Sequence, residues 1–194
     1  MQFLLRITTV LFSLVLLSGI ACRKEGSAAQ TTVDVSRQWD IDALGNLVFG
    51  YADGQWQSAR FTPTEMNLFH RFDTASLAGT SRPADVLETT LNLNSVFPNP
   101  FVESGGHRLQ FHFTPGYSGT VLLKAVYVDS LLHPVYSTAM RFSSAALPLP
   151  TPALSELIAI RPTVEIGRYR LYYTLSAAGA PDFYKAWGDV ERNR

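Results

Sequence analysis

The chain has 194 residues, of which 46% are hydrophobic, 12% aromatic and 16% charged, and its 16 acidic side chains balance 16 basic ones. This length is sufficient for one domain with a substantial buried core. The charged share is below the roughly 25% usual in soluble domains, and a net charge of zero supplies no basic field to attract a polyanion, so we expect no nucleic-acid partner. The aromatic content favours a mainly β protein.

Residues 1–21 are typical of a signal peptide. A single basic residue, Arg6, precedes an apolar run from Ile7 to Leu17, and small residues follow, which is the pattern of an export signal. The apolar run is too short to favour a permanent membrane span. We therefore expect the protein to be exported.

Cys22, the only cysteine, directly follows this segment. Its place after Ala21 and before a polar stretch resembles the signal of bacterial lipoproteins, in which the cysteine is lipidated and becomes the first residue of the mature chain. Gly19 stands where that family prefers leucine, and ordinary cleavage after Ala21 is the alternative. Lipidation would anchor the protein in the outer membrane, facing the periplasm or the surface, whereas the alternative predicts a secreted protein. In either case the chain can form no intramolecular disulfide.

Residues 22–36 show little apolar periodicity and are expected to form a flexible tether. The following segment, residues 37–84, is expected to begin with a small β-meander. Apolar and polar residues alternate within it, and the pair Asp53–Gly54 is typical of a type I′ hairpin turn. The three predicted strands cover residues 39–43, 47–51 and 55–61.

One short helix is predicted after the meander. Thr62 is a suitable N-cap, Pro63 suits the first helical position, and Glu65 completes a capping box. The helix is expected to end near Arg71, before a polar linker over residues 73–84.

Residues 85–194 are expected to form an Ig-like antiparallel β-sandwich, because several short alternating strands are separated by turn residues. Within residues 107–113, Leu109 and Phe111 are expected to face the core. The stretch TVLLKAVYV, residues 120–128, is apolar on both faces and is predicted to be a central strand.

Two prolines flank one asparagine in the stretch Phe97, Pro98, Asn99, Pro100 and Phe101. Each proline fixes its own φ, lacks an N–H donor and favours an extended conformation in the residue before it. The stretch is therefore expected to be a stiff, extended lead-in that is not a fully paired central strand. The two phenylalanines are expected to anchor it in the core.

These five residues also resemble the Pro-Asn-Pro-Phe opening motif of the C-terminal sorting domains of the type IX secretion system of Bacteroidota. Such domains are small Ig-like sandwiches that end in a Gly-x-Tyr-type strand, and Gly167–Leu171 is similar to it. In this sequence Phe97 replaces the usual tyrosine, and the chain continues past the point where the signal normally ends. Two roles remain open, a sorting signal of a secreted cargo protein and a structural brace in a lipoprotein.

No pattern of catalytic, metal-binding or cofactor-binding residues stands out. The zinc, phosphate-loop and nucleophile-elbow motifs are absent. His107 and His112 fall on opposite faces of a predicted strand, with no cysteine or glutamate at ligand spacing. We interpret them, with His70 and His133, as solvated surface residues, and we expect no catalytic residue, metal or cofactor.

The leading hypothesis is a non-enzymatic lipoprotein of the cell envelope that acts as a structural or binding module, with an envelope protein or a glycan as its partner. The first alternative is a secreted cargo protein that carries a type IX sorting-like domain. The second is a glycan-binding module, although most aromatic residues of a β-sandwich belong to its core. If a ligand face exists, we expect Arg168, Arg170 and Tyr172 to form it, because they share one face of a predicted strand.

Overall fold

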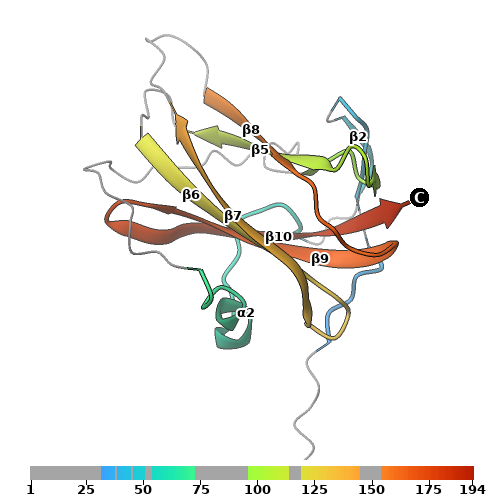
Figure 1. Ribbon diagram of the computed structural model, residues 1–194, viewed down its shortest axis with the longest axis horizontal. Coiled ribbons are helices and arrows are strands. Elements are labelled where there is room, and N and C mark those ends of the chain that lie inside the picture. The colour runs from blue at the N-terminus through green and yellow to red at the C-terminus, as the bar shows by residue number, and fades with distance from the viewer. Residues whose placement is uncertain are drawn as a thin grey trace, which may run out of the picture. The chain divides into compact units, whose positions relative to one another are not determined.

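A computed structural model of the protein describes residues 32–37, 39–44, 46–50, 54–72, 96–113, 119–144 and 154–194. The expected signal peptide, Cys22, most of the expected tether and the expected linker over residues 73–84 lie outside these ranges. Residues Thr32–Arg194 form one compact unit. The protein is mainly β and contains several sheets (Figure 1).

The described strands and the helix follow one another along the chain as β1 (Asp40–Ile41), β2 (Leu47–Phe49), α2 (Pro63–Asn67), β3 (Val96–Phe97), β4 (Phe101–Val102), β5 (His107–Phe113), β6 (Gly119–Val128), β7 (Pro134–Ser144), β8 (Leu154–Ile160), β9 (Gly167–Ala177) and β10 (Ala180–Asn193). A five-stranded sheet has the order β4-β10-β9-β6-β7, and a three-stranded sheet has the order β3-β5-β8. Strands β1 and β2 form a separate hairpin. None of the helices in the described ranges is long and apolar enough to cross a membrane.

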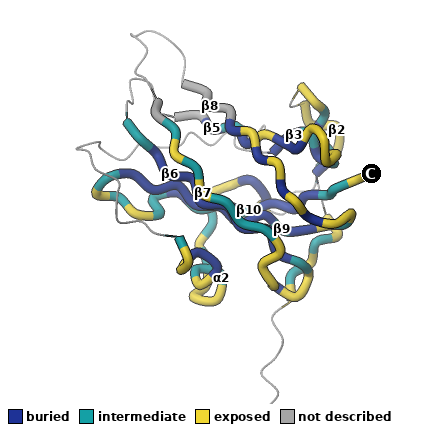
Figure 2. Tube along the Cα trace, in the orientation of Figure 1, coloured by how far each residue is buried: buried dark blue, intermediate teal, exposed yellow. Residues whose placement is uncertain are grey.

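Strand β6 occupies the middle of the five-stranded sheet, between β7 and β9. Its residues from Val121 to Val128 are all buried (Figure 2), so the prediction of a central strand is confirmed. At one edge β10 pairs with β4 in parallel, with Arg192 opposite Phe101. The expectation of a purely antiparallel arrangement is therefore wrong at this edge, because the two-residue strand β4 runs in the same direction as the end of β10.

One large buried cluster contains side chains of both the five-stranded and the three-stranded sheet. Leu109 and Phe111 of β5 belong to it and are fully buried, as expected. Trp39 and Ile41 belong to the same cluster, so the segments expected at residues 37–84 and 85–194 share one core.

Residues 55–61 do not form the expected third strand of a meander. Instead, the Trp56 amide donates to the Trp187 carbonyl (2.7 Å) and the Ala59 amide donates to the Lys185 carbonyl (2.8 Å). The segment therefore lies along the free edge of β10, where backbone donors and acceptors are available and the Trp56 side chain can be buried.

The last residues of the expected tether are bound to the sheet. The Val33 amide donates to the Ser130 carbonyl (2.9 Å), and the guanidinium groups of Arg168 and Arg170 donate to carbonyls of residues 36 and 34. Residues 32–36 are therefore not part of a flexible tether.

Helix α2 begins as its sequence predicts. The Glu65 amide donates to Thr62 Oγ1 (3.3 Å) and the Thr62 amide donates to Glu65 Oε2 (2.7 Å), so the capping box is confirmed. The helix ends earlier than expected, at Asn67, and turns continue to Arg71. A second buried cluster, which includes Phe69 and Tyr172, joins this segment to the five-stranded sheet, on the face opposite β5 and β8 (Figure 1).

Candidate functional site

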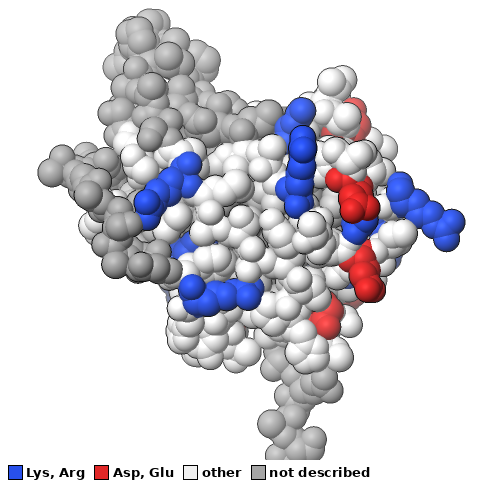
Figure 3. All heavy atoms as spheres, viewed as in Figure 1, with Lys and Arg blue, Asp and Glu red and all other residues white. Residues whose placement is uncertain are grey.

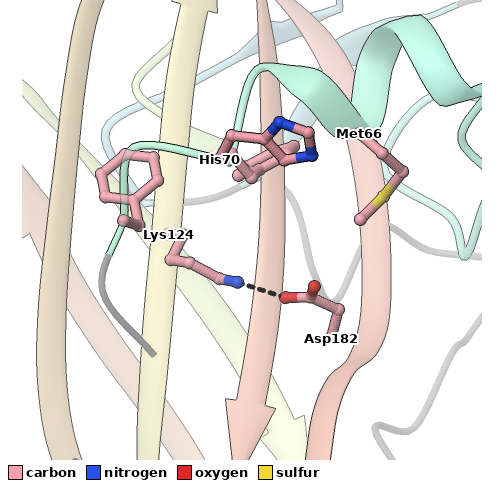
Figure 4. A pocket seen from close by; sticks show the side chains of 6 residues that line it. Met66, His70, Lys124 and Asp182 are labelled. Atoms are coloured by element: carbon pink, nitrogen blue, oxygen red, sulfur yellow. Dashed lines mark ion pairs between the residues drawn. The ribbon is translucent and has the colours of Figure 1, made fainter. Parts of the chain in front are cut away.

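A pocket of about 230 Å³ lies between the α2 segment and strands β6 and β10 (Figure 4). One wall is largely apolar and the other carries two opposite charges; the lining residues are Met66, Phe69, His70, Phe72, Lys124 and Asp182. Figure 4 shows Lys124 and Asp182 pointing toward each other.

An irregularity of β10 positions Asp182. The pairing of β9 with β10 shifts register between Ala180 and Tyr184, and Asp182 has a φ of +48°, a conformation that residues other than glycine rarely adopt. Bulges in a sheet change the direction in which a side chain points. Here the irregular backbone directs the carboxylate toward β6.

The Asp182 carboxylate is held by three donors. Its Oδ1 atom accepts from Lys124 Nζ (2.5 Å), Thr174 Oγ1 (2.9 Å) and Ser176 Oγ (3.0 Å). Burial alone would raise the pKa of Asp182, but the hydrogen bonds from Lys124 and Thr174 and the charge of Lys124 hold it below its usual value. The carboxyl group is therefore ionised at neutral pH.

Lys124 is almost entirely buried, with 2% of its side chain exposed. Its ammonium group lies 6.0 Å from the centre of the Phe69 ring, a distance at which a cation is attracted to an aromatic face. A buried lysine is stable only when it is paired, and Asp182 supplies that pair. The pocket thus offers a neutral ion pair opposite an apolar wall, an arrangement that can accept a small polar group without net charge.

The sequence pattern gives one signal for this pocket. Lys124 interrupts the otherwise apolar stretch TVLLKAVYV, and lysine is rarely buried without a partner. Asp182 stands in a turn-like Pro-Asp pair with no comparable signal. Across the described part of the chain, no group of three or more His, Cys, Asp or Glu residues is placed to hold a metal ion.

The expected ligand face is largely closed. Tyr172 is fully buried, because Phe61 packs edge-on against its ring at 5.3 Å and its hydroxyl donates to Glu65 Oε1 (2.9 Å). Burial, together with the hydrogen bond to the Glu65 carboxylate, raises the pKa of Tyr172. Tyr172 therefore contributes no exposed surface to the conditional ligand face, because the α2 segment covers it.

The two arginines of that face are engaged in ion pairs. Arg170 Nε lies 2.7 Å from Asp189 Oδ1, and its guanidinium stacks 4.0 Å from the centre of the Trp187 ring. Arg168 Nε lies 3.0 Å from Glu191 Oε2 and stays about half exposed. These contacts join β9 to β10, which leaves Arg168 as the accessible member of the expected face.

His107 is buried, with 1% of its surface exposed, so its interpretation as a surface residue is wrong. Its Nε2 atom is hydrogen-bonded to the Tyr127 hydroxyl, and its ring packs edge-on against Phe101 at 4.5 Å. Burial lowers the pKa of His107 to about 3. His70 and His133 are exposed as expected, and the side chain of His112 lies outside the described part of the structure.

Asn99 lies at the centre of the proline-flanked stretch and is buried. Its Nδ2 atom donates to the carbonyls of Trp39 (2.7 Å) and Asp189 (2.9 Å), and its Oδ1 atom accepts from the Glu191 amide (3.0 Å). Its backbone exchanges two further hydrogen bonds with Ile41. Asn99 thus joins Trp39 and the adjoining strand β1 to β10 through its side chain and its backbone.

The rest of this stretch connects the two larger sheets, since β3 belongs to the three-stranded sheet and β4 to the five-stranded sheet. Phe97 and Phe101 are buried, so their predicted place in the core is confirmed. The peptide bonds before Pro98 and Pro100 are both cis, which the sequence pattern does not indicate.

Charged side chains are dispersed on the face shown in Figure 3. Lysine and arginine side chains there are separated by uncharged surface and by acidic residues, without a continuous basic patch among the described atoms. Comparison with protein-family models, with curated proteins and with solved structures finds no match to the chain.

Proposed function

We propose that the protein is a non-enzymatic lipoprotein of the cell envelope, held in the outer membrane by lipid on Cys22 and acting there as a structural or binding module. Its folded part is an Ig-like β-sandwich to which residues 32–72 contribute. The proposal is supported by the export signal, by the position of the single cysteine, and by the mainly β fold.

The observation that carries the proposal is the set of contacts made by Asn99. A cleavable sorting domain is expected to fold apart from its cargo, with few contacts across the boundary. Asn99 instead binds both Trp39 and the last strand, β10, through buried hydrogen bonds. These contacts support the role of the proline-flanked stretch as a structural brace within one folded body, in preference to a separable sorting domain.

The pocket beside Lys124 and Asp182 is the proposed binding feature of this module. A neutral ion pair and an apolar wall suit a small uncharged polar group, either of a partner protein or of a glycan. A glycan-binding role based on an exposed Tyr172 lacks support, because this side chain is buried.

Mass spectrometry of the terminal peptides of the native protein, purified from cell membranes, tests the proposal. Diacylglyceryl mass on Cys22, together with an intact Arg194, is the expected result. An unmodified chain recovered from the growth medium and cut near Asn94 would overturn the proposal and support the secreted cargo protein.

A further inference from the structure

The β1–β2 hairpin exposes several large apolar side chains at one place. The exposed fractions are 85% for Leu44, 45% for Leu47, 70% for Val48 and 52% for Phe49. In the sequence, no charged residue occurs from position 43 to position 52. Single exposed apolar residues are normal on protein surfaces, but a group of them marks a surface that contacts something apolar. Figure 2 shows the exposure of β2.

Hydrogen bonds hold this apolar tip in place. Asp42 Oδ1 accepts from the amides of Leu44 (2.9 Å) and Asn46 (2.8 Å), and Asp42 Oδ2 accepts from Asn46 Nδ2 (2.9 Å). At its base, Ile41 is paired with Asn99 of the core stretch. Leu44 and Asn46, on either side of the turn, are therefore both hydrogen-bonded to Asp42, and the base of the hairpin is part of the core.

The size and chemistry of the tip indicate what kind of surface it contacts. A stable protein complex buries about 800 Å² on each partner, more than four partly exposed side chains provide, so a second copy of the chain is disfavoured. The four exposed side chains of the tip are all apolar, and the Asp42 carboxylate at its base accepts hydrogen bonds from the amides of Leu44 and Asn46. A bilayer requires no minimum contact area and accepts apolar side chains at the boundary between headgroups and acyl chains.

We propose that the tip formed by Leu44, Leu47, Val48 and Phe49 inserts into the interface of the bilayer that carries the lipid anchor. This inference rests on the proposed function. Nine residues, Arg23–Thr31, separate Cys22 from the compact unit, and a chain of that length spans at most about 30 Å. The length of this segment limits how far Thr32 can lie from the lipid anchor, and a second apolar contact with the bilayer reinforces that anchor and orients the protein.

Vesicle binding without the anchor tests this inference separately from lipidation. The test protein consists of residues 23–194, which contain the whole compact unit Thr32–Arg194 and neither Cys22 nor the signal peptide. It is sedimented with phosphatidylcholine–phosphatidylethanolamine vesicles at increasing lipid concentration, and its oligomeric state is measured by analytical ultracentrifugation.

The double variant Leu44→Ser/Val48→Ser is compared with the control Val135→Ser/Ile166→Ser, which removes two exposed apolar side chains elsewhere. The expected result is that the unchanged protein is monomeric and binds vesicles, that the tip variant binds at least ten-fold more weakly, and that the control binds within two-fold of the unchanged protein. Absence of vesicle binding by the unchanged protein, or equal binding by the two variants, would overturn the inference. A dimer that only the tip variant dissociates would also overturn it, in favour of a second copy.

A fluorescent label gives a second, local measurement. Residues 23–194 contain no cysteine, so Val48→Cys and Val135→Cys each provide one attachment site for a polarity-sensitive fluorophore. On addition of vesicles the label at position 48 is expected to shift to shorter wavelength, and the label at position 135 is expected not to shift. Equal behaviour of the two labels would contradict insertion of the tip, and lipidation of Cys22 would be unaffected by this result.

Discussion

Replacing Gly188 by alanine is expected to destabilise the protein strongly, because the indole ring of Trp56 lies where the new Cβ atom would be placed. That atom would stand 2.2 Å from Cε2, 2.3 Å from Cζ2 and 2.4 Å from Cδ2 of Trp56. All three distances are well below van der Waals contact. Trp56 is 2% exposed and belongs to the large buried cluster, so its ring cannot move without disturbing the core.

Two known costs bound the expected loss of stability. An inserted methyl group in a packed core costs about 1–3 kcal/mol, and complete loss of a buried tryptophan side chain costs about 3–5 kcal/mol. We expect Gly188→Ala to lower the free energy of unfolding by about 3 kcal/mol, measured by urea denaturation of residues 23–194. Gly105→Ala is the control, since Gly105 is exposed and its added Cβ would come no closer than 3.8 Å to any atom. The control is expected to stay within about 1 kcal/mol of the unchanged protein.

A double-mutant cycle tests the cause of this loss. Trp56→Ala removes the ring that collides with the new methyl group, so adding Gly188→Ala to it is expected to cost nothing further. The interaction energy of the cycle is then about 3 kcal/mol, opposite in sign to the single losses. Additive losses of the two substitutions would refute the explanation by collision.

Three further predictions concern other contacts. His107 stays neutral in the folded protein down to a pKa of about 3, whereas the same side chain in the unfolded chain binds a proton below about pH 6.5. The free energy of unfolding therefore falls as the pH is lowered. Between about pH 6.5 and pH 5 the unchanged protein is expected to lose about 1.6 kcal/mol relative to His107→Gln in urea titrations. Equal pH dependence of the two proteins would contradict the burial of a neutral histidine. Asp182→Asn leaves the buried charge of Lys124 without a counter-ion and is expected to cost about 3 kcal/mol, and adding Lys124→Met is expected to recover part of that loss; a further loss would contradict the pairing. Asn99→Ala removes the three side-chain hydrogen bonds to Trp39, Asp189 and Glu191 and is expected to cost about 3 kcal/mol. A change below about 1 kcal/mol would show that these hydrogen bonds contribute little.

Features that depend on neighbouring residues are predictable from the sequence. The capping box of Thr62 and Glu65 lies within one helical turn, and the structure contains it. The central position of residues 120–128 follows from their apolar character on both faces, and the predicted burial of Leu109 and Phe111 follows from strict alternation. In each of these cases the residues within a few positions are sufficient to predict the feature.

Features that depend on distant parts of the chain are not predictable in this way. Lys124 of β6 and Asp182 of β10 meet across β9, which pairs with both strands. The Asp182 carboxylate points toward β6 only because the pairing of β10 with β9 is irregular. His107 is different, because it shares the strand face of Leu109 and Phe111 and alternation alone therefore places it on the core side. Its polar type led to the wrong interpretation, and only its partners Phe101 and Tyr127, which come from other strands, are not predictable from the pattern.

The position of the segment around Trp56 also depends on a distant part of the chain. Its alternating residues are typical of a strand, but a pattern does not specify the partner. The free edge of β10 pairs with the segment in place of β2, and the Trp56 side chain becomes part of the core.

Hydrogen exchange along a urea titration tests most directly whether the proline-flanked stretch is a brace within one folded body. Peptides from residues 39–49 and from residues 167–193 of the 23–194 protein are followed by mass spectrometry as urea is raised. The account predicts that both groups of peptides lose protection in one transition, because Asn99 joins them through buried hydrogen bonds. Continued protection of residues 96–194 after residues 39–72 have lost theirs would contradict it, and would indicate a separable sorting domain.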